Sequence, residues 1–296
     1  MKKDAQFFVH TIAITALFIL GNAVIILPAG NVNEFTFLAF ILSLLVGILL
    51  LFPFSFLAKT VFCKSTPKNV VLKTGKILLL VFLCIFSLFT VSDAFSSFIN
   101  FVKTVLLTNT PTFFITVIFA VTVLFFFLRK QEDVLKFFLI CVGAVVIIIL
   151  FFFLATSFDF NLRNIFVFSL PKVKDLLSQA KPYILNPALT AVILPFYTAA
   201  FFKRPRKSAL FAGFFCGYIL LGLCVIGSVL LLGSAFAGEL PYPYSAAVST
   251  VSIGRLFTRL DGFSYFVYFV CSLAKITVCL FVIKESLKKI NSILKN

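Results

Sequence analysis

Long apolar runs alternate with short polar segments along the whole chain. A helix needs about 20 mostly apolar residues to cross roughly 30 Å of hydrocarbon, and several runs reach that length. The runs are continuous and do not alternate residue by residue, which argues against a transmembrane β-barrel. The pattern therefore predicts an all-α integral membrane protein, a polytopic bundle of about eight transmembrane helices. We expect them at about residues 8–28, 35–57, 77–102, 110–128, 134–155, 183–202, 208–235 and 262–283.

Composition supports a membrane environment. Hydrophobic residues make up 61% of the 296 residues, charged residues only 12%, and the mean hydropathy is +1.15. So little polar surface would not coat a soluble globule of this length. The net charge of +16 could indicate nucleic-acid binding. The basic residues, however, lie in short segments between apolar runs and form no basic face with interleaved aromatics. We expect the lipid bilayer as a partner and no nucleic acid.

The distribution of lysine and arginine predicts the orientation. Positive residues are retained on the cytoplasmic side of a membrane protein. Of the 26 basic residues, 18 lie at the two termini and in the segments 58–76, 129–136 and 203–207. Both termini are therefore expected in the cytoplasm. Two long loops, 156–182 and 236–261, would face outward, and their prolines and mixed polarity are typical of short helices along the interface.

Most residues that carry enzyme or metal chemistry are missing. The seven cysteines include no Cys-x-x-Cys pair, which indicates neither a zinc site nor a disulfide framework. His10 is the only histidine, so neither a histidine-based metal site nor a catalytic triad can be built. There is no Gly-x-Ser-x-Gly elbow, P-loop or Gly-x-Gly-x-x-Gly fingerprint. We expect no enzyme activity, no metal and no cofactor.

The first and sixth spans share an interrupted pattern. In each, an asparagine beside a helix-disfavouring residue precedes an apolar run that ends in Ile-Leu-Pro: Gly21-Asn22 to Pro28, and Asn186-Pro187 to Pro195. Interrupted helices at matching positions of two halves indicate a transporter-type site at the bilayer midplane. A zwitterion such as an amino acid would suit the exposed helix ends. Ordinary helix packing and proline kinks are the alternative. The predicted ligand-binding residues are Gly21, Asn22, Ala23, Asn186, Pro187, Ala188 and Thr190.

Two charged residues lie well inside predicted spans, Asp93 in the third and Lys275 in the eighth. Intramembrane charges are costly and normally have a partner. We expect the two to compensate each other, directly or through polar neighbours such as Ser92, Ser96, Ser97 and Ser272. Burial disfavours the charged form of a lysine. Lys275 is therefore a candidate for proton coupling, with a structural ion pair as the alternative.

Three segments carry a resemblance to a known family. They are Gly21 to Pro28, Phe202-Lys-Arg-Pro205, and above all Leu240-Pro-Tyr-Pro-Tyr-Ser245 continuing through Val251 to Asp261, followed by Lys275. Together they resemble the B subunits of nutrient germinant receptors of endospores, the GerAB-like germination permeases of the amino acid–polyamine–organocation superfamily. The resemblance implies an inverted-repeat fold. Residues 1–155 would form a first five-helix repeat and residues 183–296 an incomplete second repeat of three helices, within one transmembrane domain spanning 1–296.

The resemblance implies a spore germination protein, a transporter-like membrane subunit that binds a small germinant such as an amino acid. It further implies A-type and C-type receptor subunits as partners and the spore inner membrane as location. Two alternatives stay open: a proton-coupled amino acid transporter that uses Lys275, and a non-transporting structural or vestigial membrane protein.

Overall fold

The computed structural model describes residues 2–27, 35–62, 70–161, 164, 173–201, 207–250 and 261–295. All regular elements within these residues are helices. The predicted features at Pro28, at 202–205 and at 251–260 lie outside the described residues. The helices are α1 Lys2–Leu20, α2 Ala23–Ile26, α3 Thr36–Phe62, α4 Val70–Phe101, α5 Thr112–Leu128, α6 Gln131–Thr156, α7 Val173–Tyr183, α8 Ile193–Phe201, α9 Lys207–Leu232, α10 Ser234–Glu239, α11 Pro243–Ser249 and α12 Asp261–Lys295.

Seven helical segments in the described part of the chain are long and apolar enough to cross a membrane. The eighth, α5, is apolar but has only 17 residues. At 1.5 Å per residue it is about 26 Å long, near the lower limit for a span. The prediction of a polytopic helical membrane bundle is confirmed.

Two boundaries differ from the predicted spans by ten residues or more. The sixth apolar segment starts at Val173, ten residues earlier than expected, because α7 runs into it through a π-helical turn. The long loop before it thus contributes a helix that continues the span. At the other end of the chain, α12 continues to Lys295 through turns that mix lysines with other polar and apolar residues. Those last turns pack beside the end of α3, where Lys289 donates to the carbonyl of Phe62, and beside the start of α4, where Lys76 lies near Lys289.

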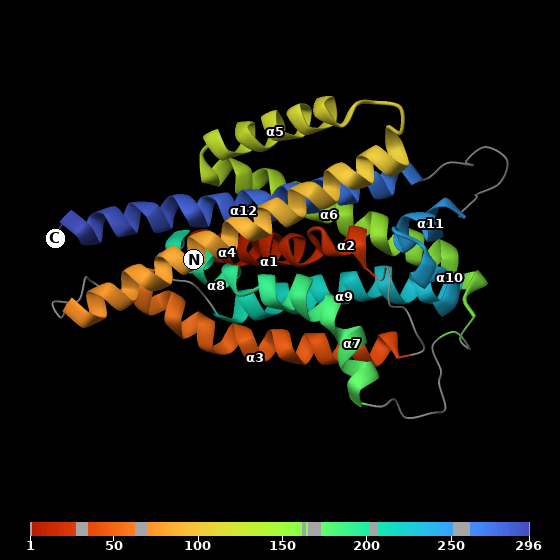
Figure 1. Ribbon diagram of the computed structural model, residues 1–296, viewed down its shortest axis with the longest axis horizontal. Coiled ribbons are helices and arrows are strands. Elements are labelled where there is room, and N and C mark those ends of the chain that lie inside the picture. Colours follow the sequence, from red (N-terminus) through yellow and green to blue (C-terminus); the bar gives the residue numbers. More distant parts are fainter. Residues whose placement is uncertain are drawn as a thin grey trace.

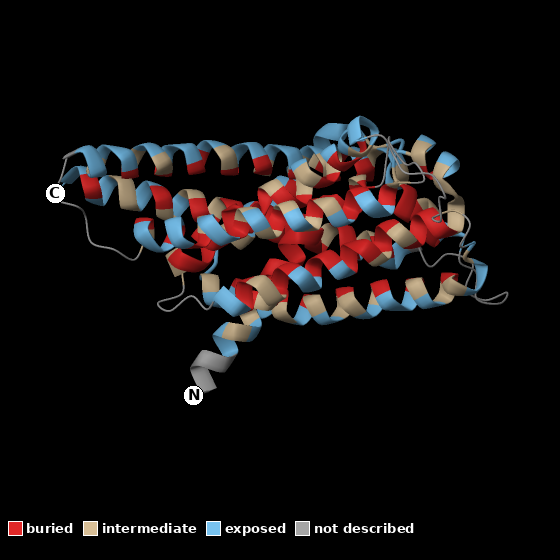
Figure 2. Ribbon diagram, turned by 90° about the horizontal axis from the view of Figure 1, so that it is seen from below, coloured by how far each residue is buried: buried red, intermediate tan, exposed pale blue. Residues whose placement is uncertain are grey.

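Helices α1 and α12 form the centre of the bundle (Figure 1). In each of these two spans 78% of the apolar window is buried, against 28% in α3 and α6. Figure 2 shows the same contrast, with buried residues concentrated in the middle and exposed residues along the outer helices. The peripheral helices present large apolar side chains outward, as a lipid-facing surface requires.

Helix α9 reaches the centre because two of its glycines let it approach α1 closely. A Cβ at Gly213 would lie 2.7 Å from Cβ of Thr15, and one at Gly217 would lie 2.8 Å from Cβ of Ile19. The Gly-x-x-x-Gly spacing puts both positions on one helix face, the arrangement that permits tight packing of membrane helices. The first broken span is thereby fixed against α9.

The bundle has two distinct ends. Helix α1 begins and α12 ends at the same end, while the short helices α10 and α11 lie at the opposite one (Figure 1). Helix α11 starts with Pro243 in its first turn, where a missing N–H costs nothing. Its buried residues include Tyr244, Ser245 and Val248. The Tyr-Pro-Tyr segment of the sequence is thus part of the packed bundle and not a surface loop.

Candidate functional site

The first span is interrupted at Gly21 and Asn22. The helix α1 stops at Leu20, a two-residue turn follows, and α2 continues for one turn. Gly21 has a φ of +33°, in the region that disfavours other residues. A Cβ there would overlap the side chain of Lys275 and lie 2.8 Å from the carbonyl oxygen of Phe18. Two independent constraints therefore require glycine at position 21: the backbone conformation and the space occupied by the side chain of Lys275.

The sixth span departs from α-helical geometry around Pro187. Residues Ile184–Ala188 form a π-helical turn, and a second turn at residues 191–192 precedes α8. Proline lacks an N–H and clashes with the preceding turn, which favours such a widened turn. The Thr190 hydroxyl donates to the carbonyl of Asn186. The predicted interruption is present, but the chain leaves helical geometry fully only at residues 191–192, four residues beyond Pro187.

Lys275 joins the two interrupted spans. It lies about 20 Å along α12 from Gly262 and is completely buried. Its Nζ donates to Oδ1 of Asn22 and to Oδ1 of Asn186, both at 2.8 Å. The ammonium also lies 5.6 Å from the ring centroid of Phe18, within the range of a cation–π contact. One cation thus bridges the asparagines that the sequence marks in both halves.

Asp93 compensates this charge through Asn22. The amide of Asn22 donates to Oδ2 of Asp93 at 2.7 Å and contacts Oγ of Ser97 at 3.4 Å. Ser97 donates in turn to the backbone carbonyl of Asp93. No direct ion pair joins Asp93 and Lys275 in the described part of the structure. Asn22 is completely buried, whereas Asp93 is exposed on the side of α4. The polar chain therefore runs from the centre of the bundle to its surface.

The structure brings together four of the predicted residues, Asn22, Asn186, Asp93 and Lys275, with Gly21 packed against the lysine. We call these five residues the broken-helix site. Ala23 and Pro187 are buried beside it. Ala188 lies elsewhere, since its Cβ faces Gly47 on α3. Of the serines expected to mediate the charge pair, only Ser97 takes part. Ser92 and Ser96 are exposed, and the buried Ser272 hydroxyl has no hydrogen-bond partner among the residues that the structure describes.

Phe18 is a site residue that the sequence reasoning missed. Its ring is completely buried next to the ammonium of Lys275. One signal was present: Phe18 stands four residues before Asn22 and therefore lies on the same face of the helix. Among 43 phenylalanines, however, that spacing alone marks no single one.

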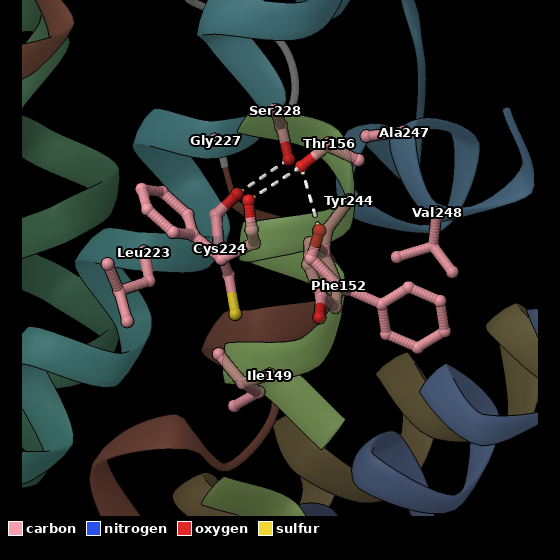
Figure 3. Close-up of a pocket in the computed structure, with 11 residues that line it drawn as sticks. Ile149, Phe152, Thr156, Leu223, Cys224, Gly227, Ser228, Tyr244, Ala247 and Val248 are labelled. Carbon is pink, nitrogen blue, oxygen red and sulfur yellow. Dashed lines mark hydrogen bonds between the residues drawn. The ribbon is translucent and has the colours of Figure 1, made fainter. Parts of the chain in front are cut away.

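A small pocket, lined mainly by apolar side chains, lies at the end of the bundle near α11. It has a volume of about 10 Å³, room for one water molecule, between α6, α9 and α11 (Figure 3). The hydroxyls of Thr156 and Ser228 both donate to backbone carbonyls of their own helices. The Tyr244 hydroxyl, from the Tyr-Pro-Tyr segment, is buried beside the thiol of Cys224. The pocket is separate from the broken-helix site.

Comparison with protein families matches residues 7–296, almost the whole chain, to the family described as spore germination protein. The chain belongs to this spore germination permease family. No individual curated protein matches it. Family membership confirms the resemblance carried by the first span, the Tyr-Pro-Tyr segment and Lys275. Its family and its long apolar helices make this germination protein an integral membrane protein of the permease type.

Proposed function

We propose that this spore germination protein is the transporter-like membrane subunit of a nutrient germinant receptor and binds a small germinant, an amino acid, at the broken-helix site. One observation supports the proposal most: Lys275 is held by asparagines from both interrupted helices, Asn22 and Asn186. Because one lysine side chain hydrogen-bonds residues at both helix breaks, movement of either helix changes the geometry of the site. Ligand binding there has a direct way to alter the shape of the bundle.

An amino acid suits the charges of this site. Its carboxylate would take Lys275 as counter-ion, and its ammonium group would compete for the asparagine oxygens or approach Asp93. The remaining parts of the proposal concern assembly and location. We propose A-type and C-type subunits as partners, the spore inner membrane as location, and cytoplasmic termini at the end where α1 begins and α12 ends.

The test is ligand binding to the purified chain in lipid nanodiscs, screened by thermal shift over amino acids, sugars and nucleosides. We expect one amino acid to raise the Tm, and Gly21→Leu and Asn186→Ala to weaken its binding at least tenfold. Thr60→Ala, an exposed position on α3, serves as the control and should bind like the parent. If nothing in the screen binds, the alternative of a purely structural membrane protein is favoured.

A proton-coupled amino acid transporter is the second candidate. The two ionisable residues inside the spans, the buried Lys275 and the exposed Asp93, favour it, because such residues form proton pathways in transporters. Asn22 hydrogen-bonds both of them. In this case vesicles that contain the protein show saturable uptake driven by a pH gradient. Uptake is lost in Lys275→Ala. Uptake that persists in this variant rules out the coupling role of the lysine.

A further inference from the structure

One face of α4 changes character halfway along the helix. In the half nearer its start, this face carries exposed apolar side chains, from Leu78 at 66% exposed to Phe89 at 72%. The same line of positions continues at intervals of three or four residues, which keeps it on one side of the helix. Beyond Phe89 the exposed residues of α4 are polar, and an exposed threonine follows in the π-helical turn Val102–Leu106. We call these residues the polar stripe: Ser92, Asp93, Ser96, Asn100 and Thr104.

The polar stripe lies at the depth of the hydrocarbon core. Asp93 hydrogen-bonds through Asn22 to Lys275, so it lies near the level of that lysine, about midway along the central span. At 1.5 Å per residue, Ser96 and Asn100 lie about 5 and 10 Å farther along the helix. Half the hydrocarbon core is about 15 Å thick. Lipid tails would therefore touch the stripe from Ser92 to Asn100 if nothing covered it.

Lipid is a poor neighbour for these side chains. A carboxylate in hydrocarbon is costly, and intramembrane polar side chains normally face protein or water. The chain leaves them exposed: all five residues are accessible to solvent, although one carboxylate oxygen of Asp93 is bound by Asn22. The apolar half of the same face shows that α4 can present a lipid-compatible surface. The polarity of the other half therefore indicates contact with something other than lipid.

We propose that the polar stripe is a docking surface for a transmembrane helix of a different membrane protein, which presents hydrogen-bond donors to Asp93, Ser96 and Asn100. The negative charge of Asp93 favours a different protein over a second copy of this chain. A second copy docked through the same face would bring two Asp93 carboxylates together at the membrane centre, which is unfavourable. A helix with serine, threonine, asparagine, glutamine or basic side chains complements the stripe. It would also cover Asp93, the exposed residue of the broken-helix site, whichever ligand that site takes.

The first experiment maps what touches the stripe. A photo-crosslinking amino acid is placed at Asn100 in the full-length chain in its native membrane, with a control at Leu49, which is 74% exposed on α3. We expect at least tenfold more protein adduct from Asn100. Mass spectrometry should place the adduct in a membrane-spanning segment of another protein that carries donor side chains. In the reciprocal experiment, a photo-crosslinking amino acid placed in that segment should form an adduct with α4.

Two outcomes overturn the proposal. An adduct of twice the mass of this 33.0 kDa chain means that a second copy covers the stripe. Adducts to lipid alone, at the level of the control, mean that the stripe faces the bilayer.

The second experiment separates docking from folding. Asn100→Leu makes the stripe more lipid-compatible, so the Tm of the purified chain in nanodiscs should stay constant or rise. The adduct formed from a crosslinker at Ser96 should instead fall at least tenfold, and Asn100→Ala, which adds no bulk, should have the same effect. Thr60→Leu, an equivalent change on α3, should alter neither the Tm nor the amount of adduct. Adduct formation that persists in both Asn100 variants contradicts the proposal.

Discussion

At the scale of single residues, the main feature is a cation whose partners come from three helices. Lys275 on α12 contacts Asn22 at the first break and Asn186 at the second, and Asp93 on α4 binds the far side of Asn22. Asparagine can do this because its amide accepts at one atom and donates at another. Asn22 therefore links the charges of Lys275 and Asp93, which do not contact each other directly.

The charge network should be energetically coupled. Lys275→Met leaves the oxygens of Asn22 and Asn186 and the carboxylate of Asp93 without their cation, so we expect a loss of about 3 kcal/mol in stability. Combined with Asp93→Asn, the loss should be smaller than the sum of the single losses by about 1 kcal/mol. Denaturant unfolding in detergent micelles measures both quantities.

The control for that cycle is Lys288→Met, which removes only a surface pair with Glu285 and should cost at most about 0.5 kcal/mol. Losses at Asp93 and Lys275 that simply add would show that Asn22 does not couple the two charges.

Gly21 should not tolerate even alanine. A methyl group there meets Lys275 and the carbonyl of Phe18, at a φ that disfavours any side chain. We expect Gly21→Ala to reduce stability by about 1–3 kcal/mol. Gly143→Ala is the matched control: it lies in helix α6 with nothing within 4 Å of the new Cβ, and should be neutral or stabilising by up to about 1 kcal/mol. Equal effects at the two glycines would contradict this account of the break.

At the scale of helices, the broken spans depend on what they pack against. Half-helices such as α2, with four residues, cannot be stable alone and need neighbours on all sides. Helix α9 holds α1 through its glycine face, and α11 caps the other end with buried tyrosine and valine. The long α12 lies against both breaks, consistent with its buried share of 78%. Two interruptions are therefore compatible with a rigid core.

Packing between α1 and α9 should fail when the glycine face is filled. Gly217→Leu inserts a side chain where Ile19 and the backbone of Ala16 already lie within about 3 Å of the position of a Cβ. We expect a loss of at least about 1–3 kcal/mol, seen as a lower Tm in nanodiscs. Cys216→Leu, one residue earlier on the exposed side of α9, should leave the Tm unchanged. A tolerated Gly217→Leu would mean that the helices separate easily at this point.

At the scale of the molecule, the basic residues and the two bundle ends agree. The start of α1 and the end of α12 lie at one end (Figure 1), and most lysines and arginines belong to the termini and loops assigned to that side. Positive charge is retained in the cytoplasm during insertion. We therefore propose that both termini face the cytoplasm, which requires the short helix α5 to cross the membrane as an eighth span.

A topology reporter tests that orientation. An enzyme or fluorescent protein fused after Asn296 should be active only as a cytoplasmic fusion, and one inserted at Gly238, in the helix α10, should report the outer side. A C-terminal fusion that reads as external would reverse the assignment of every loop.

The sequence by itself determined the apolar spans, the break at Gly21, the intramembrane charges and the family. These depend on local properties: the length of an apolar run, the conformational freedom of glycine, and the solvation cost of a charge. The partners of Lys275 and the exposure of the polar stripe were decided by tertiary structure. Asn22 and Asn186 lie 253 and 89 residues from the lysine in the chain. Such contacts depend on which helix faces meet, and hydropathy does not specify a face when nearly every face is apolar. The inverted repeat stays a prediction.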